Sequence, residues 1–157
     1  MIKSLCLLGY NQILTMEGNM KKFKVALLQT FVSKDKEKNI ENAVNLIEHV
    51  SKEGADMAVF PEMFCCPYDN SFFKEYGEEE GGSAYAKMGD AANKSGIYVV
   101  AGTIPELEED KVFNTSYVFD RKGRQTAKHR KMHLFDIDVE GGQYFKESDV
   151  LSPGRDV

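Results

Sequence analysis

The stretch Ala58-Val59-Phe60-Pro61-Glu62-Met63-Phe64 decides how the rest of this sequence is interpreted. Its apolar start predicts a short buried strand, and the proline predicts where that strand ends. Glu62 follows at once, which places it at the rim of a sheet, where α/β proteins bind ligands. Because a glutamate is rarely fully buried unless it is paired or catalytic, we expect Glu62 to have a partner elsewhere in the sequence.

The segments on either side of this stretch predict a β-α-β unit. Residues 23–29 and 57–60 are apolar runs typical of buried strands. Between them Asp35 or Ser33 can cap a helix that Gly54 ends. The apolar positions of this helix recur at helical spacing and form one stripe: Ile40, Ala43, Val44, Ile47 and Val50. Two strands joined in this way are expected to be parallel, with a right-handed crossover.

The elements that follow predict a mixed sheet. Ser83 can cap a second helix that ends at Gly96, and residues 97–101 form another buried strand. Residues 114–119 and 124–131 are expected to pair as antiparallel strands across a short turn. The sequence therefore belongs to the α/β class, with at least one layer of helices over the sheet.

Two segments in the middle of the chain are predicted to be irregular. Residues 65–82 contain several structure breakers and many aromatic side chains. This segment either forms a wall of a small-molecule pocket or packs over the edge of the sheet. Residues 106–110 are expected to form an acidic turn.

The two ends of the sequence are expected to differ from its middle. Residues 1–20 form no convincing element and Met20 precedes a clean strand, so they are interpreted as an N-terminal extension outside the fold. Residues 21–157 are assigned to one domain. Residues 152–157 predict a turn and the approach to another strand, so we expect the domain to be cut short there.

The composition favours a cytoplasmic protein that binds neither nucleic acid nor membrane. Hydrophobic residues make up 42% of the chain and the net charge is −5, which does not favour binding to nucleic acid. No apolar run approaches the roughly 20 residues that span a membrane. The three cysteines, Cys6, Cys65 and Cys66, form no disulfide framework and indicate a reducing compartment. The adjacent pair is interpreted as small buried residues, with a nucleophile as the alternative.

Lys131 is the best candidate partner for Glu62. It ends the last predicted strand, where alternation places it on one face with His129 and His133. It is either a solvent-facing cation or a group that stabilises negative charge on a reacting carbonyl oxygen. The histidine pair suggests a metal site as an alternative, but no third ligand is evident. We therefore predict neither a metal nor a cofactor.

Two motifs resemble the first two catalytic motifs of the nitrilase superfamily of carbon–nitrogen hydrolases: Phe60-Pro61-Glu62-Met63-Phe64 and His129-Arg130-Lys131-Met132-His133-Leu134-Phe135-Asp136. The resemblance extends over about residues 22–157. It implies an α-β-β-α sandwich, here truncated, and a Glu-Lys-Cys triad with Glu62 as the general base and Lys131 as the oxyanion stabiliser. Glu147 resembles the second glutamate that positions the lysine and the substrate, and an exposed loop acid is its alternative.

The nucleophilic cysteine of this family has no counterpart in the sequence. None of Cys6, Cys65 and Cys66 stands in its motif, so the resemblance implies the N-terminal part of an enzyme, inactive by itself. Residues 64–68 and 133–138 are most similar to ω-amidase-type members, which cleave the terminal amide of small dicarboxylic monoamides and release ammonia. A nitrile or a carbamoyl amine is the alternative substrate. The resemblance also implies a homo-oligomer, commonly a dimer.

Two functions of other classes stay open. A chain without its nucleophile could be a catalytically inactive, partner-binding protein on the same fold. An unrelated nucleotide-binding α/β domain is a weaker alternative. Its Gly-rich phosphate loop is expected after the first strand, where Thr30-Phe31-Val32-Ser33 stands instead.

Overall fold

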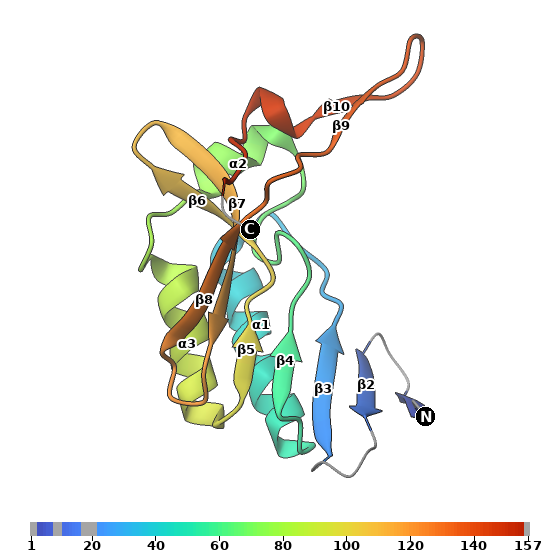
Figure 1. The fold of residues 1–157 in the computed structure, drawn as a ribbon, viewed down its shortest axis with the longest axis vertical. Coiled ribbons are helices and arrows are strands. Elements are labelled where there is room, and N and C mark those ends of the chain that lie inside the picture. Colours follow the sequence, from blue (N-terminus) through green and yellow to red (C-terminus); the bar gives the residue numbers. More distant parts are fainter. Residues whose placement is uncertain (1–2, 8–10, 17–21, 156–157) are drawn as a thin grey trace.

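The protein is described by a computed structural model, which covers residues 3–7, 11–16 and 22–155. In chain order its elements are β1 Lys3–Leu7, β2 Asn11–Met16, β3 Phe23–Leu28, α1 Lys36–Lys52, β4 Met57–Val59, α2 Asn70–Tyr76, α3 Ser83–Ser95, β5 Tyr98–Val100, β6 Ile104–Glu108, β7 Lys111–Phe119, β8 Gln125–Arg130, β9 Asp136–Asp138, β10 Tyr144–Lys146 and the 3₁₀ helix η1 Glu147–Asp149. A large sheet carries α1 and α3 on one face, and the β9–β10 hairpin extends away from it (Figure 1).

The large sheet is mixed. Its order is β1-β2-β3-β4-β5-β7-β6, and β8 pairs with β7 off this path. β3, β4 and β5 run parallel, whereas β7 pairs antiparallel with β5, β6 and β8. The predicted antiparallel pair is thus confirmed as β7 and β8. β1 and β2 lie within residues 1–20, where the sequence predicts no strand, and extend the sheet antiparallel from β3. The domain boundary after residue 20 stays a prediction.

The predicted β-α-β unit is confirmed. The side chain of Asp35, the N-cap of α1, accepts a hydrogen bond from the backbone N–H of Lys38 at 3.0 Å. Gly54 follows the helix with a φ of 80°, a left-handed conformation that favours glycine. Most of the predicted stripe is buried in the core, namely Ile40, Ala43, Ile47 and Val50.

The helices cover one face of the sheet only. Ala26, Ala58 and Val99 are fully buried and belong to the same core cluster as residues of α1 and α3. In Figure 1 these two helices lie behind the strands. The alternate positions of the same strands are only half-buried: Val25, Leu27, Met57, Val59, Tyr98 and Val100. We call these six residues the open face. The arrangement confirms the predicted α/β class and the predicted helix layer.

Helix α2 forms inside the segment that the sequence predicts as irregular. Asp69 caps it by accepting a hydrogen bond from the backbone N–H of Ser71 at 2.9 Å. Phe73 and Tyr76 are buried in a second, smaller apolar cluster. The helix has seven residues, which is too short for an apolar periodicity to stand out from the surrounding breakers.

Strand β6 occupies most of the segment predicted as the acidic turn at residues 106–110, so this prediction is wrong. Only Glu109 and Asp110 form the turn between β6 and β7. Glu106 is 2% exposed, because Arg130 and Lys128 donate hydrogen bonds to its carboxylate. In a sequence such a paired glutamate cannot be distinguished from a surface residue.

Helix α3 begins at the predicted residue but is capped in another way. Gly82 is its N-cap and no cap side chain makes a hydrogen bond. Instead the carboxylate of Glu78 accepts a hydrogen bond from the backbone N–H of Ala84 at 3.0 Å. The sequence pattern predicts only a cap from the residue at the start of the helix, here Ser83, and so does not predict a cap from Glu78. Gly96 ends the helix as predicted, with a φ of 66°.

Candidate active site

Glu62 lies just past the end of β4, in a tight bend of the backbone. Met63 has a φ of 51°, and its N–H donates to the Thr103 hydroxyl at 2.8 Å. Gly102, with a φ of 49°, lies against the same bend. A Cβ on Gly102 would lie 2.0 Å from the carbonyl oxygen of Pro61. The segment between β5 and β6 therefore holds the bend that presents Glu62, and only glycine fits at residue 102.

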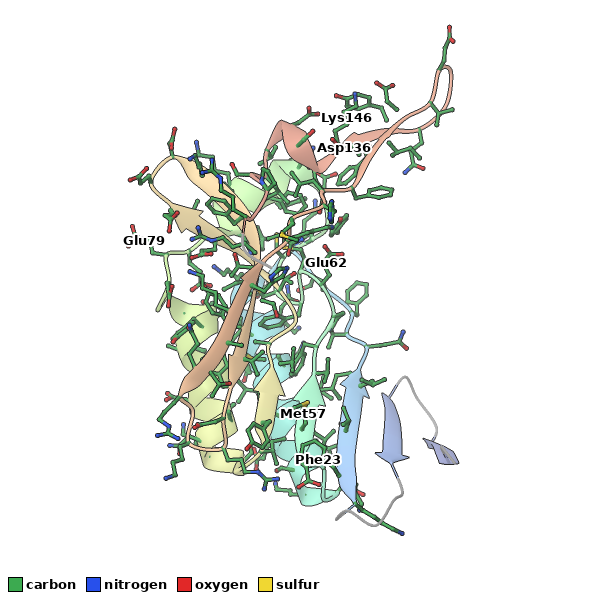
Figure 2. All side chains as sticks on the ribbon, viewed as in Figure 1. Phe23, Met57, Glu62, Glu79, Asp136 and Lys146 are labelled. Carbon is green, nitrogen blue, oxygen red and sulfur yellow. The ribbon has the colours of Figure 1, made fainter. Side chains whose placement is uncertain are left out.

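Lys131 comes directly after β8 and is fixed through its backbone. Its N–H donates to the carbonyl of Asn114 at 2.8 Å, and its carbonyl accepts from the N–H of Gly154 at 2.9 Å. The ammonium Nζ lies 2.8 Å from Oε1 of Glu62. The structure thus brings together the two residues that the first two motifs predict. In Figure 2 the Glu62 side chain lies near the end of the sheet from which the hairpin extends.

Glu147, in η1, contacts the same ammonium and is fully buried, so it is not the exposed loop acid of the alternative interpretation. Lys131 Nζ lies 3.1 Å from Oε1 and 2.9 Å from Oε2 of this carboxylate. The Tyr68 hydroxyl donates to Oε1 at 2.7 Å, and the N–H of Phe135 donates to Oε2 at 2.5 Å. Both oxygens of Glu147 are therefore occupied by donors.

The electrostatics of this cluster keep Lys131 charged. Partial burial disfavours its ammonium, but hydrogen bonds and attraction from Glu62 and Glu147 outweigh this and raise the pKa of Lys131 above its ordinary value. Burial, followed by its hydrogen bond to Glu147, raises the pKa of Tyr68, which keeps the phenol a donor at neutral pH. The cluster holds a permanent cation beside Glu62.

Asn114 and Tyr68 belong to this cluster although the sequence analysis does not single them out as site residues. Asn114, on β7, is 1% exposed, and its Nδ2 donates to Oε1 of Glu62 at 2.6 Å. The available signal was an asparagine at the start of the strand predicted over residues 114–119, because asparagine is depleted in strands. Tyr68 belongs to the aromatic segment 65–82, which is predicted either to form a pocket wall or to pack over the sheet edge, and no residue of this segment lines the pocket beside the cluster.

A pocket of about 470 Å³ opens beside the cluster. Glu62, Asn114 and Lys131 line it together with His129 and His133, which agrees with the predicted common face of the two histidines and the lysine. Its other lining residues are Phe60, Val100, Gly102, Thr103, Ser116 and Met132. Within residues 3–7, 11–16 and 22–155, no group of three His, Cys, Asp or Glu side chains is arranged to hold a metal ion.

The adjacent cysteines are unsuited to supply a nucleophile. Cys65 and Cys66 are both free and buried. Burial raises the pKa of each thiol to about 12, so both stay protonated at neutral pH. This favours their interpretation as small buried residues.

The sequence matches a known protein family over most of its length. The profile described as Carbon-nitrogen hydrolase matches residues 24–157. The chain belongs to this family. Omega-amidase NIT2 of Danio rerio is 45% identical over 136 residues, which are 87% of this hydrolase-family chain and 49% of the relative. Nitrilase homolog 2 of Dictyostelium discoideum is 42% identical over 141 residues, 88% of this chain and 43% of the relative. The chain thus spans about half the length of the curated relatives it matches.

Solved structures confirm the fold class. Nit3 of Saccharomyces cerevisiae, described as a member of branch 10 of the nitrilase superfamily, is similar with a TM-score of 0.73 and 38% identity. This similarity covers 85% of the hydrolase-family chain and 49% of Nit3. An amidase of Nesterenkonia sp. AN1 is similar with a TM-score of 0.70 and 20% identity, over 85% of this chain and 49% of the amidase. At this identity the similarity shows the fold alone. The predicted membership of the nitrilase superfamily is confirmed. In the described part of the chain, no helix has the length and apolarity needed to cross a membrane.

Proposed function

We propose that this protein takes part in the hydrolysis of a carbon–nitrogen bond in a small amide, with Glu62 as the general base. Lys131 offsets negative charge on the reacting carbonyl oxygen, and Glu147 holds Lys131 in place. Similarity to Omega-amidase NIT2 favours a terminal amide of a small dicarboxylic monoamide as the substrate. A nitrile or a carbamoyl amine is the alternative. A homodimer and a cytoplasmic location belong to the same proposal.

The observation that carries this proposal is the contrast between the two carboxylates. Both oxygens of the buried Glu147 accept hydrogen bonds, so this group has no free lone pair directed at a substrate. Glu62 is different. Its side chain is 43% exposed, it lines the pocket, and Lys131 and Asn114 both donate to Oε1. No described residue donates to Oε2, so this oxygen can accept a proton.

The proposed reaction needs a thiol that none of the cysteines of this sequence supplies. Oε2 of Glu62 takes the proton of that thiol, and the thiolate attacks the amide carbon. Lys131 stabilises the oxyanion that forms. The C–N bond breaks, and ammonia leaves with the proton from Glu62. Glu62 then removes a proton from water, whose oxygen attacks the thioester. The carboxylic acid is released and the thiol regains its proton.

Ammonia release from a small dicarboxylic monoamide tests this proposal. We expect no turnover from the 157-residue chain alone. We expect turnover when it is joined to the part of the Danio rerio relative that it does not match. Glu62→Gln should abolish that turnover, because a neutral amide cannot accept the proton, while Glu75→Gln on the exposed side of α2 should not. Turnover that survives Glu62→Gln contradicts the proposal. A joined protein that folds and never turns over favours the partner-binding alternative.

A further inference from the structure

Asn114 contacts both members of the proposed catalytic pair. Its side-chain Nδ2 donates to Oε1 of Glu62 at 2.6 Å. Its backbone carbonyl accepts from the N–H of Lys131 at 2.8 Å. These contacts join residues from three different parts of the sequence: the bend after β4, the middle of β7 and the end of β8. A change in the position of Asn114 therefore affects both Glu62 and Lys131.

The other end of the Asn114 side chain is unsatisfied. Its Oδ1 is buried and has no hydrogen-bond partner within the described residues. A buried carbonyl without a partner is destabilising, and an apolar residue of similar size would avoid this cost. The only side-chain hydrogen bond of Asn114 in the described structure is the one to Glu62. The contact with Glu62 is thus the physical reason for an amide at this position.

Lys131 alone cannot fix the carboxylate of Glu62. The final torsion of a glutamate side chain is broad, so a partly exposed carboxylate rotates unless several donors hold it. The Lys131 ammonium is a compact charge with rotatable donors and is shared with both oxygens of Glu147, so it does not by itself select one rotation of the Glu62 carboxylate. A second donor from a rigid strand restricts Glu62 further. With Lys131 and Asn114 both on Oε1, Oε2 is left free to face the pocket.

We propose that Asn114 is a positioning residue that fixes the rotation of the Glu62 carboxylate and thereby makes Oε2 the proton-accepting atom. The proposal rests on the role of Glu62 proposed above. It assigns no contact between Asn114 and the substrate. It also explains why a polar side chain lies between buried neighbours on β7.

NMR of the full 157-residue chain tests this inference. In the unsubstituted protein we expect the Nδ2 protons of Asn114 to be shifted downfield and the Lys131 ammonium to be protected from exchange with water. Asn114→Leu keeps the approximate volume but removes the donor. In this variant the protons of the Lys131 ammonium should exchange faster with water, because the Glu62 carboxylate is no longer held in the position that accepts from this ammonium. Asn39→Leu is the matched control, since Asn39 is another buried asparagine, whose Nδ2 donates to the backbone carbonyls of Ser33 and Cys65 and not to Glu62. It should leave Lys131 unchanged.

A second variant covers the case in which Asn114→Leu does not fold. Glu62→Ala changes a partly exposed side chain and should shift the Nδ2 protons of Asn114 upfield. If these protons stay in place in Glu62→Ala, or the Lys131 ammonium exchanges equally slowly in folded Asn114→Leu, the inference is wrong. These spectra do not depend on catalysis, so their failure is distinct from that of the proposed function, which only the amidase assay decides.

Discussion

At the scale of single residues, one lysine serves two carboxylates of very different burial. Glu147 is fully buried, whereas Glu62 is 43% exposed. Removing the cation from a buried carboxylate costs far more than removing it from an exposed one. We therefore expect Lys131→Met to lower the free energy of unfolding by about 3 kcal/mol, and Glu62→Gln by less than about 1 kcal/mol. Urea denaturation of the two variants measures both values.

A double variant separates the effect of charge from that of packing. Glu147→Gln retains an acceptor for the hydroxyl of Tyr68 and removes the buried charge. When combined with Lys131→Met it should destabilise the chain less than the sum of the two single changes, because no unpaired charge remains. Strict additivity would show that Lys131 does not stabilise Glu147, contrary to the ion pair in the structure.

The sequence predicts Glu62 and Lys131 because each stands in a short motif at the end of a predicted strand. Glu147 is predicted by resemblance alone, since nothing local shows that it is buried. Asn114 and Tyr68 escape prediction for a physical reason. Their roles depend on hydrogen bonds to residues 52 and 79 positions away in the sequence. Local propensity marks Asn114 as unusual in a strand, but it does not identify the distant residue that Asn114 or Tyr68 contacts.

At the scale of elements, the break between β5 and β6 positions the bend that carries Glu62. Gly102 has a φ of 49°, and an added Cβ would lie 2.0 Å from a backbone oxygen of Pro61. Gly102→Ala should therefore lower the free energy of unfolding by at least about 3 kcal/mol, from left-handed strain plus overpacking. Thermal or urea denaturation measures this loss.

Gly96 provides the matched control for Gly102. It also has a left-handed φ, of 66°, but a Cβ there would meet nothing within 4 Å. Gly96→Ala should therefore cost only about 1–2 kcal/mol, the strain of the left-handed backbone. Equal losses in the two variants would mean that the close approach to Pro61 contributes nothing.

The elements that the sequence predicts correctly are those with a long pattern of their own. The stripe of α1 and the apolar run of β4 can be recognised without knowledge of the fold. β6 and α2 are missed because tertiary partners decide their structure. Glu106 enters a strand only because cations of β8 neutralise it, and α2 is stabilised by two buried aromatic residues, Phe73 and Tyr76.

At the scale of the whole molecule, the candidate site and the open face lie on neighbouring parts of one sheet. Val100 belongs to the open face and also lines the pocket. The helices pack against the opposite face, whereas the pocket reaches the open face at Val100. This arrangement agrees with the ligand position expected at strand ends in α/β proteins.

Stability of the whole molecule in acid depends on the network around Glu106, which joins β6, β7 and β8. Burial opposes ionisation of Glu106, but hydrogen bonds from Arg130, Lys128 and Thr115 outweigh it and lower its pKa from 4.5 to about 2. Because the folded-state pKa is lowered, this stabilisation is complete above about pH 4.5 and is lost as the pH falls towards 2. The ionised carboxylate should contribute roughly 2 kcal/mol that disappears in this window.

Glu106→Gln isolates this contribution, since other carboxylates also titrate in acid. The variant should be less stable than the unsubstituted chain at pH 6, because Arg130 and Lys128 lose the charge of their shared partner. Its free energy of unfolding should then fall less steeply between pH 4.5 and 2. Glu79→Gln makes the same chemical change at an exposed position and should keep the original steepness. Urea denaturation at several pH values compares the three chains. If Glu106→Gln loses stability as steeply as the unsubstituted chain, the acid sensitivity arises outside this network, and Glu106 is already protonated in the folded protein well above pH 2.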